Sequence, residues 1–153
     1  PATAARKEEP PQRPPTLSNV AYGTHERQVL DFWKAESARP APLLFHIHGG
    51  GWVTGTKEAA SLQVLPWLEM GWTVVNVEYR LGKNSLAPAA VEDCRCALRW
   101  VIRNAKQYNF DVNKIVLTGH SAGGHLSLIT GMVPGVFVPY MAMTMVFSSS
   151  SGR

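Results

Sequence analysis

The sequence predicts an α/β domain whose sheet is mostly parallel, with an antiparallel hairpin on its N-terminal side. Three short apolar runs lack the alternation of a half-exposed strand, which is typical of strands covered on both faces. Each run precedes a segment with helical features, and strands that alternate with helices are joined by right-handed parallel crossovers. With 153 residues, 45% of them hydrophobic, the chain can form one compact core, so disorder throughout is excluded.

The N-terminal part separates into a tail and a hairpin. Five of the first fifteen residues are proline, so residues 1–16 are expected to form a flexible tail ahead of a domain over residues 17–153. Residues 19–22 and 28–33 have strand character, and the Gly-Thr-His-Glu segment between them favours a turn. We therefore expect an antiparallel edge hairpin.

The inner elements follow as strand, helix, strand, helix, strand, helix. Gly71 is a C-terminal stop for the first helix, and Pro88 opens the second. The second helix has the clearest pattern, an apolar stripe made of Val91, Cys94, Leu98, Val101 and Ala105. The expected order is strand 43–47, helix 57–70 interrupted or entered near Pro66, strand 73–79, the helix from Pro88, strand 114–118 and helix 121–131.

The clearest chemical motif is Gly119-His120-Ser121-Ala122-Gly123, which fits G-x-S-x-G. It lies between a predicted strand and a predicted helix, which is the context that a nucleophile elbow requires. Small flanking residues allow a sharp turn that exposes the serine hydroxyl. The free amides and positive end of the following helix can stabilise a developing oxyanion. An ordinary glycine-flanked turn is the simpler alternative for this pentapeptide taken by itself.

A second motif, His48-Gly49-Gly50-Gly51-Trp52, follows the strand predicted over 43–47. Because both motifs follow parallel strands, we expect them to meet at the carboxyl-end edge of the sheet. Consecutive glycines let backbone amides approach a substrate oxygen, which is how an oxyanion hole is built from main chain. A flexible glycine loop is the alternative, but two pieces of the same machinery in the expected order favour a hydrolase scaffold.

Together these motifs resemble the α/β-hydrolase superfamily, specifically hormone-sensitive-lipase-like and acetyl-esterase serine esterases. The resemblance covers about residues 19–134. Further matching pieces are Glu78-Tyr79-Arg80, the helix from Glu92-Asp93 to Trp100, and Asp111-Val112-Asn113-Lys114-Ile115. It implies a three-layer fold and hydrolysis of small or medium carboxylic esters through a serine acyl-enzyme, with no metal or organic cofactor.

The resemblance also implies the site residues. They are the nucleophile Ser121, the oxyanion-hole residues Gly49, Gly50, Gly51 and Ala122, and the site-shaping residues His48, Trp52 and His120. His48 is expected to hold the conformation of the loop and not to act as the base. Trp52 is expected to help shape an acyl or alcohol pocket, and His120 to pack against the loop.

The region after Ser121 departs from this family. The triad order in the fold is Ser, then Asp or Glu, then His, but no acidic residue follows Ser121, and His125 is the only histidine there. We expect His125 to pack beneath the elbow, with a base role as the weaker alternative. The C-terminal part of the domain is therefore expected to be missing, and the chain alone to hydrolyse esters feebly. The alternative function is a non-catalytic remnant or binding module that keeps the pocket.

Other charge and metal patterns have simpler interpretations. A net charge of +4 does not demand nucleic acid, and the basic stripe of Arg95, Arg99 and Arg103 is typical of a solvated helix face. His46 and His48 share a strand face, but no third ligand has the spacing of a metal site. We expect neither nucleic-acid nor metal binding.

The C-terminal segment and the cysteines give the last expectations. The apolar run over 136–147 would add a hydrophobic edge strand, through which an oligomer or a complementing chain could pair. No uncharged apolar run is long enough to predict a membrane span. Cys94 and Cys96 point to different faces of one helix, so no disulfide is expected. No leader is visible, and the compartment stays open, with a secreted or periplasmic location included if one was removed before Pro1.

Overall fold

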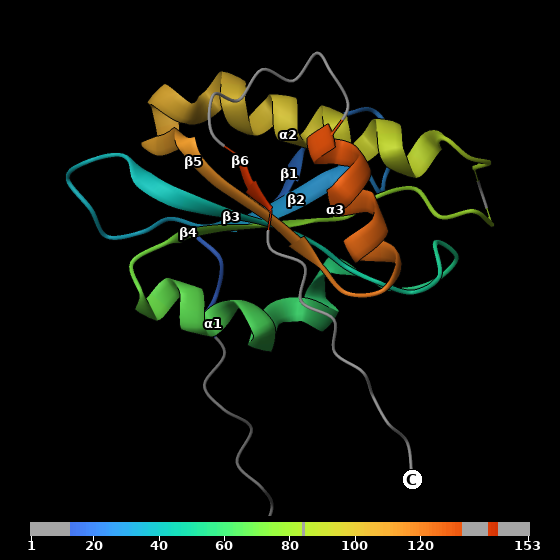
Figure 1. Cartoon of the computed structure of the whole chain (residues 1–153), viewed down its shortest axis with the longest axis horizontal. Helices are drawn as coiled ribbons and strands as arrows, with labels where there is room; N and C mark the ends of the chain where they lie inside the picture. The colour runs from blue at the N-terminus through green and yellow to red at the C-terminus, as the bar shows by residue number, and fades with distance from the viewer. Residues whose placement is uncertain (1–12, 84, 133–140, 144–153) are drawn as a thin grey trace, which may run out of the picture.

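The computed structural model describes residues 13–83, 85–132 and 141–143, which include a six-stranded sheet (Figure 1). Its strands are β1 (Leu17–Ala21), β2 (Val29–Trp33), β3 (Ala41–Ile47), β4 (Thr73–Val77), β5 (Phe110–Gly119) and β6 (Met141–Met143). Their order in the sheet is β1-β2-β4-β3-β5-β6. β1, β2 and β4 pair antiparallel, and β4, β3, β5 and β6 pair parallel. The predicted mixed sheet with an N-terminal antiparallel hairpin is confirmed.

The helices cover both faces of this sheet (Figure 1). α2 (Ala89–Tyr108) and α3 (Ala122–Met132) lie on one face. The 3-10 helix η1 (Lys57–Ala60) and α1 (Ser61–Glu69) lie on the other. The domain therefore has the three layers that were predicted. Within the part of the chain that the structure describes, no helix has both the length and the apolar character needed to cross a membrane.

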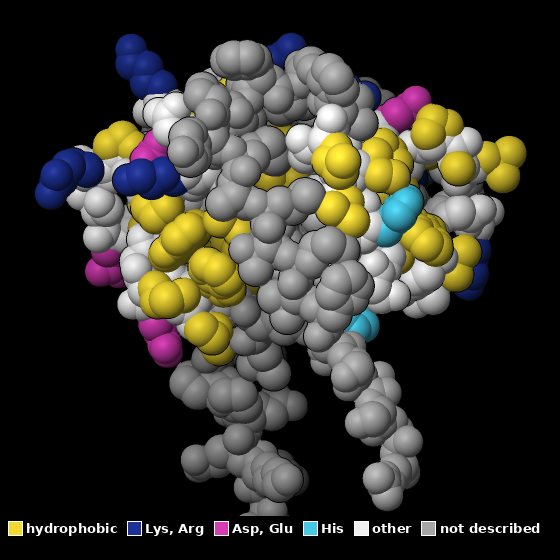
Figure 2. All heavy atoms as spheres, viewed as in Figure 1, with side chains coloured by type: hydrophobic (Ala, Val, Ile, Leu, Met, Phe, Trp, Pro, Cys, Tyr) yellow, Lys and Arg dark blue, Asp and Glu magenta, His cyan; other side chains and the backbone are white. Residues whose placement is uncertain are grey.

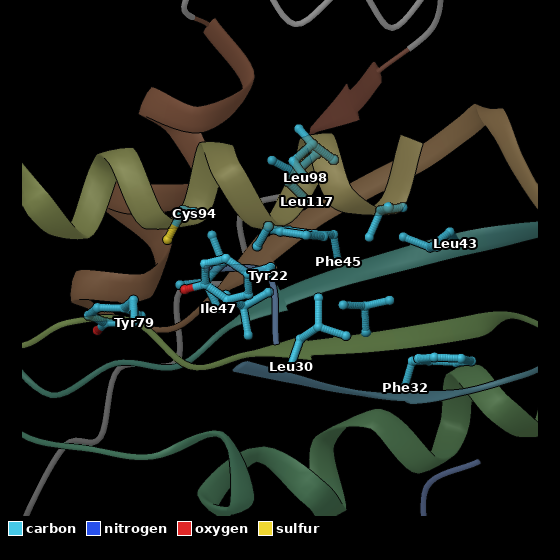
Figure 3. Close-up of a cluster of buried hydrophobic side chains, with 14 of the residues drawn as sticks. Tyr22, Leu30, Phe32, Leu43, Phe45, Ile47, Tyr79, Cys94, Leu98 and Leu117 are labelled. Carbon is cyan, nitrogen blue, oxygen red and sulfur yellow. The ribbon is translucent and has the colours of Figure 1, made fainter. Parts of the chain in front are cut away.

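The larger core fills the space between the sheet and α2 (Figure 3). Phe32 and Phe45 from the sheet, and Cys94, Leu98 and Val101 from α2, are each fully buried in it. Burying an apolar side chain of this size contributes about 1.5–3 kcal/mol. The apolar stripe predicted for the helix that follows Pro88 is therefore confirmed as the face that α2 turns toward the sheet.

A smaller core lies on the opposite face. Side chains alternate along a strand. Trp33 and Leu44 are neighbours of the larger-core residues Phe32 and Phe45, so they point to the opposite face, toward α1. There they pack with Val64 and Leu68 of α1. The prediction of a helix interrupted near Pro66 needs a correction, because α1 continues through Pro66. The helical pattern resumes after the proline with a hydrogen bond from the Met70 amide to the Pro66 carbonyl oxygen (3.1 Å).

The predicted tail over residues 1–16 and the predicted apolar run over 136–147 are described only in part. Residues 1–12 of the predicted tail lie outside the described residues. Arg13 and Thr16 contact the domain, since the Arg13 carbonyl accepts a hydrogen bond from Trp33 (2.8 Å) and the Thr16 amide donates one to Phe32 (2.8 Å). β6 lies within the predicted apolar run 136–147, whose other residues are not described.

A row of buried polar side chains crosses the sheet on the face of α1. Register places Asp31 of β2 beside Asn76 of β4, and His46 of β3 between Asn76 and Thr118 of β5. Burial, aided by the charges that His48 and His120 can carry, lowers the pKa of His46 from its usual 6.5 to about 4. His46 therefore stays neutral in the folded protein at mildly acidic pH.

This burial predicts a loss of stability in acid. Between about pH 6.5 and pH 4 the unfolded chain binds a proton at His46 and the folded chain does not, so acid favours unfolding. At about pH 5 the loss amounts to roughly 2 kcal/mol of unfolding free energy. Urea unfolding at about pH 7 and pH 5 should show this difference, and His46→Gln should reduce it. His125→Gln, which alters an exposed histidine, is the control and should keep the pH dependence of wild type. If His46→Gln also keeps it, the assignment to His46 is wrong.

Candidate active site

Ser121 lies in the turn between β5 and α3, where the backbone changes direction sharply. Its φ is 54°, in the left-handed region that non-glycine residues seldom adopt, and it is exposed. The turn is tight because a Cβ on Gly123 would overlap the carbonyl oxygen of Ile47. A Cβ on Gly119 would come within 2.6 Å of the same oxygen. The two flanking glycines thus let α3 begin directly against the end of β3.

The glycine-rich loop lies against this turn. A Cβ on Gly49 would come within 2.6 Å of the His120 carbonyl oxygen, so the two segments touch through their backbones. Gly50 has a φ of 121° and Gly51 a φ of 58°. The Gly50 carbonyl oxygen accepts hydrogen bonds from the amides of Val53 (3.1 Å) and Thr54 (3.0 Å). The loop is therefore a closed turn next to Ser121, as expected from two motifs that follow neighbouring strands.

His48 is fixed on several sides at the start of this loop. Its side chain is buried, with Nδ1 2.7 Å from the Gly49 carbonyl oxygen and Nε2 3.1 Å from the Glu78 carboxylate. Its ring stacks on Tyr79 with centroids 4.3 Å apart. The Tyr79 hydroxyl donates to the His48 carbonyl oxygen (3.0 Å), and burial raises the pKa of Tyr79, which keeps the hydroxyl a donor. These contacts support the predicted loop-holding role.

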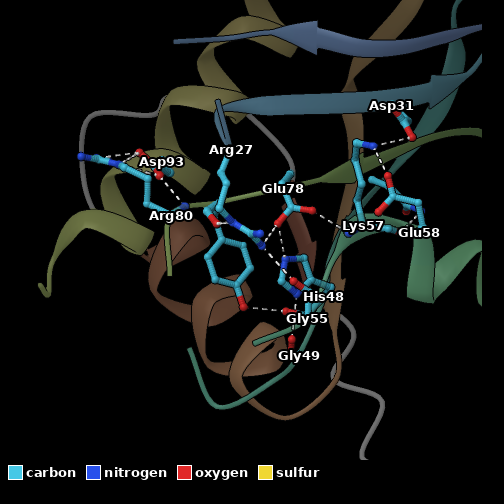
Figure 4. A network of polar contacts seen from close by, with 12 residues as sticks. Arg27, Asp31, His48, Gly49, Gly55, Lys57, Glu58, Glu78, Arg80 and Asp93 are labelled. Atoms are coloured by element: carbon cyan, nitrogen blue, oxygen red, sulfur yellow. Dashed lines mark hydrogen bonds and ion pairs between the residues drawn. The ribbon is translucent and has the colours of Figure 1, made fainter. Parts of the chain in front are cut away.

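Glu78 is the centre of the network that holds the loop (Figure 4). Its carboxylate pairs with the guanidinium of Arg27, contacts His48, and accepts a hydrogen bond from the Lys57 amide (2.9 Å). Arg27 also donates to the Gly55 carbonyl oxygen (2.8 Å), at the far end of the loop. One buried carboxylate thus joins the hairpin turn, the glycine loop and η1.

The network was not predicted from the sequence. Glu78 belongs to a matching segment of the resemblance, but no role was assigned to it or to Arg27. A signal was present, since Glu78 is a charged residue that directly follows the apolar strand β4. Buried charges of this kind are almost always paired. The partner could not be deduced, because Arg27 lies 51 residues earlier in the chain.

The other predicted site residues lie around the elbow. Ala122 begins α3 and is buried, and His120 is exposed with its ring next to Gly49. Trp52 is half exposed, and its ring meets the ring of His125 edge to face at 5.3 Å. The prediction that His125 packs beneath the elbow is wrong, because His125 is exposed. Residues four apart share a helix face, so His125 lies on the same open side as Ser121.

Among the described residues, no group of three or more His, Cys, Asp or Glu side chains is placed to hold a metal ion. In the same residues, His46, His48 and His120 line a pocket with Gly49 and Gly50, and the ring of His125 lies beside Trp52. His48 is occupied by Glu78 and Gly49, and His125 lies against Trp52.

The sheet order, the strained serine turn and the apposed glycine loop define an α/β-hydrolase. A solved bacterial heroin esterase has the same fold, with a TM-score of 0.67 and 33% identity over 83% of this chain and 42% of that one. The BD-FAE family model matches residues 30–138, and the chain belongs to this family.

Two relatives from Mycobacterium tuberculosis are similar over most of the chain. Esterase LipC is 34% identical over 116 residues, which are 74% of this chain and 29% of LipC. Carboxylesterase NlhH is 31% identical over 134 residues, which are 78% of this chain and 40% of NlhH. The chain thus spans less than half the length of these relatives.

Proposed function

We propose that the chain carries the nucleophile and the oxyanion hole of a serine carboxylic-ester hydrolase. The observation that carries this proposal is the turn at Ser121, with a φ of 54° and the glycine loop in backbone contact beside it. An exposed serine held in a rare conformation by two tightly packed glycines is typical of a nucleophile elbow. Relatives named esterase and carboxylesterase support the choice of ester chemistry.

The mechanism follows from the two motifs. Ser121 Oγ attacks the ester carbonyl carbon, and the carbonyl oxygen becomes an oxyanion. Amides of Ala122, Gly50 and either Gly49 or Gly51 stabilise that charge, helped by the N-terminus of α3. The proton of the Ser121 hydroxyl passes to water or to added imidazole. Collapse of the tetrahedral intermediate then breaks the ester bond, and the leaving alkoxide takes up a proton from the same carrier and departs as an alcohol. Water then hydrolyses the acyl-serine.

The network around Glu78 holds the glycine loop, which carries the proposed oxyanion donors, in a fixed position. Oxyanion donors stabilise charge only if they are held in place before the reaction, since reorganising them costs free energy at the transition state. Glu78, Arg27 and His48 act as positioning residues in this respect. They hold both ends of the loop, His48 at Gly49 and Arg27 at Gly55.

The rate of ester hydrolysis depends on a group that accepts the proton of the Ser121 hydroxyl. In the described residues no histidine ring is hydrogen-bonded to the Ser121 hydroxyl, and such a ring is the base that activates a serine in this class of enzyme. We therefore expect this polypeptide to release p-nitrophenol from p-nitrophenyl acetate slowly. Added imidazole, which can take the proton from solution, should accelerate the reaction.

The test compares wild type with Ser121→Ala, with and without imidazole. Imidazole hydrolyses the ester by itself, and Ser121→Ala measures that background at the same protein concentration. Wild type should exceed it, and Ser18→Ala, which alters an exposed serine on β1, should behave as wild type. Equal rates for wild type and Ser121→Ala under both conditions would contradict the proposal and favour a non-catalytic binding module.

A further inference from the structure

An apolar pocket opens beside the elbow, in addition to the motifs already described. Its volume is about 180 Å³, and Trp52, Pro88, Val91, His125 and Leu126 contribute to its wall. These residues come from the glycine loop, the start of α2 and the first turns of α3. Figure 2 shows hydrophobic side chains gathered beside a histidine on the side of the molecule where α3 lies.

Trp52 is held in an unusual position over this pocket. Its φ is 62°, a conformation that is rare for a bulky residue and that persists only when surrounding contacts enforce it. One such contact is the hydrogen bond from the Gly82 amide to the Trp52 carbonyl oxygen (2.7 Å). Trp52 is 43% exposed instead of joining either core. The ring is thus presented to the pocket at the expense of backbone strain.

The pocket adjoins both proposed catalytic motifs. Trp52 directly follows Gly51, and His125 lies one helical turn beyond Ser121. The His125 amide donates to the Ser121 carbonyl oxygen (3.2 Å), and the rings of His125 and Trp52 are in contact. Two residues of the pocket wall, Trp52 and His125, thus connect it to the glycine loop and to the turn that carries Ser121.

The charge at the rim indicates what the pocket would bind. Arg80 is the basic residue there, but its guanidinium is paired with Asp93 (2.7 Å) and lies 3.7 Å from Glu92. Arg80 is thus neutralised by acidic neighbours and offers little attraction to an anion. With the rest of the wall mostly apolar, the pocket favours an uncharged group.

We propose that this pocket is a specificity subsite that binds an uncharged apolar group of the ester, with Trp52 as its specificity-determining residue. The proposal rests on the proposed function. An apolar cavity of about 150 Å³ is enough for benzene, so this pocket accommodates about six carbon atoms, as one ring or a short chain. The group can belong to the acyl or to the alcohol part of the ester, because both flank the carbonyl carbon.

The first experiment measures binding without turnover. Cyclohexanol is titrated into the Ser121→Ala protein, and the ring resonances of His125 are followed by NMR. We expect a saturable shift that is about tenfold weaker in affinity when Trp52→Ala is added. Cyclohexanecarboxylate should cause no comparable shift. Val53→Ala is the matched control, because Val53 is 42% exposed in the same loop but lies outside the pocket wall.

The second experiment measures specificity with kcat/KM. From p-nitrophenyl acetate to the butyrate the chain gains two methylene groups, so the wild-type value should rise about tenfold if the acyl part occupies the pocket. Trp52→Ala should reduce this preference to about threefold or less, and Val53→Ala should retain it. If the alcohol part occupies the pocket, the same pattern appears between methyl acetate and propyl acetate, which also differ by two methylene groups.

The two experiments separate the subsite from the proposed function. Cyclohexanol binding that needs Trp52, together with ester hydrolysis that ignores Ser121, would retain the pocket and reject the nucleophile. Hydrolysis that needs Ser121 but is indifferent to Trp52 in both ester series would reject the subsite. Absence of a saturable cyclohexanol shift, or an equal shift with cyclohexanecarboxylate, would also reject it.

Discussion

Replacing Glu78 by alanine is expected to lower the free energy of unfolding by about 3–5 kcal/mol. The Glu78 carboxylate is 7% exposed and faces the guanidinium of Arg27, the ring of His48 and the amide of Lys57. Its removal leaves the mostly buried cation of Arg27 without its counter-charge and the buried Lys57 amide without its acceptor. Urea unfolding followed by circular dichroism measures the effect. A loss of this size is a large fraction of the stability of a typical domain.

Two companion variants make this prediction specific. Glu78→Gln keeps the size of the side chain and one acceptor oxygen, so it should cost less than Glu78→Ala but still destabilise, since Arg27 loses its counter-charge. Glu36→Ala removes an exposed carboxylate that pairs with Arg13, and should change stability by no more than about 0.5 kcal/mol. If Glu78→Ala and Glu36→Ala cost the same, the network does not hold the loop as we infer.

Replacing Gly123 by alanine is the second change with a large expected effect. The new methyl group would overlap the carbonyl oxygen of Ile47 and crowd that of His48, and both are backbone atoms that cannot rotate away. Overpacking of this kind costs about 1–3 kcal/mol or more, and relief of the overlap must move α3 away from β3. We therefore expect a lower midpoint in urea unfolding and loss of the Ser121-dependent part of the ester hydrolysis.

Gly124→Ala is the matched control in the same helix. Its Cβ would lie 3.2 Å from the Gly119 carbonyl oxygen, a tight contact that a shift of a few tenths of an ångström relieves. Alanine also favours a helix over glycine by about 1 kcal/mol, which offsets part of the crowding. Gly124→Ala should therefore be far less destabilising than Gly123→Ala. Equal losses would mean that the close approach of Ile47 does not govern the turn.

Local patterns were sufficient to predict the sheet and the position of both motifs. β3, β4 and β5 each contain a short apolar run without alternation, in β5 only over residues 115–117, as strands covered on both faces require. The stripe from Val91 to Ala105 has helical spacing and a proline before it. Chain order then placed Ser121 and Gly49 at the same edge, since parallel strands end together.

Features that depend on distant contacts could not be predicted in this way. The partners of Glu78 come from the hairpin turn and from η1, and only the register of the folded sheet brings them together. The prediction for His125 was wrong for a reason that does not involve distant contacts. The distance of four residues between His125 and Ser121 was interpreted as burial beneath the turn, although it places both residues on one exposed face.

The most direct test of the central claim is to find which residue becomes acylated. The protein is incubated with p-nitrophenyl acetate and imidazole, quenched in acid, digested and analysed by tandem mass spectrometry. We predict one acetyl group on Ser121, absent from Ser121→Ala and strongly reduced in Gly123→Ala. Acetylation confined to lysines or to other serines, with Ser121 unmodified in the folded protein, would contradict the account.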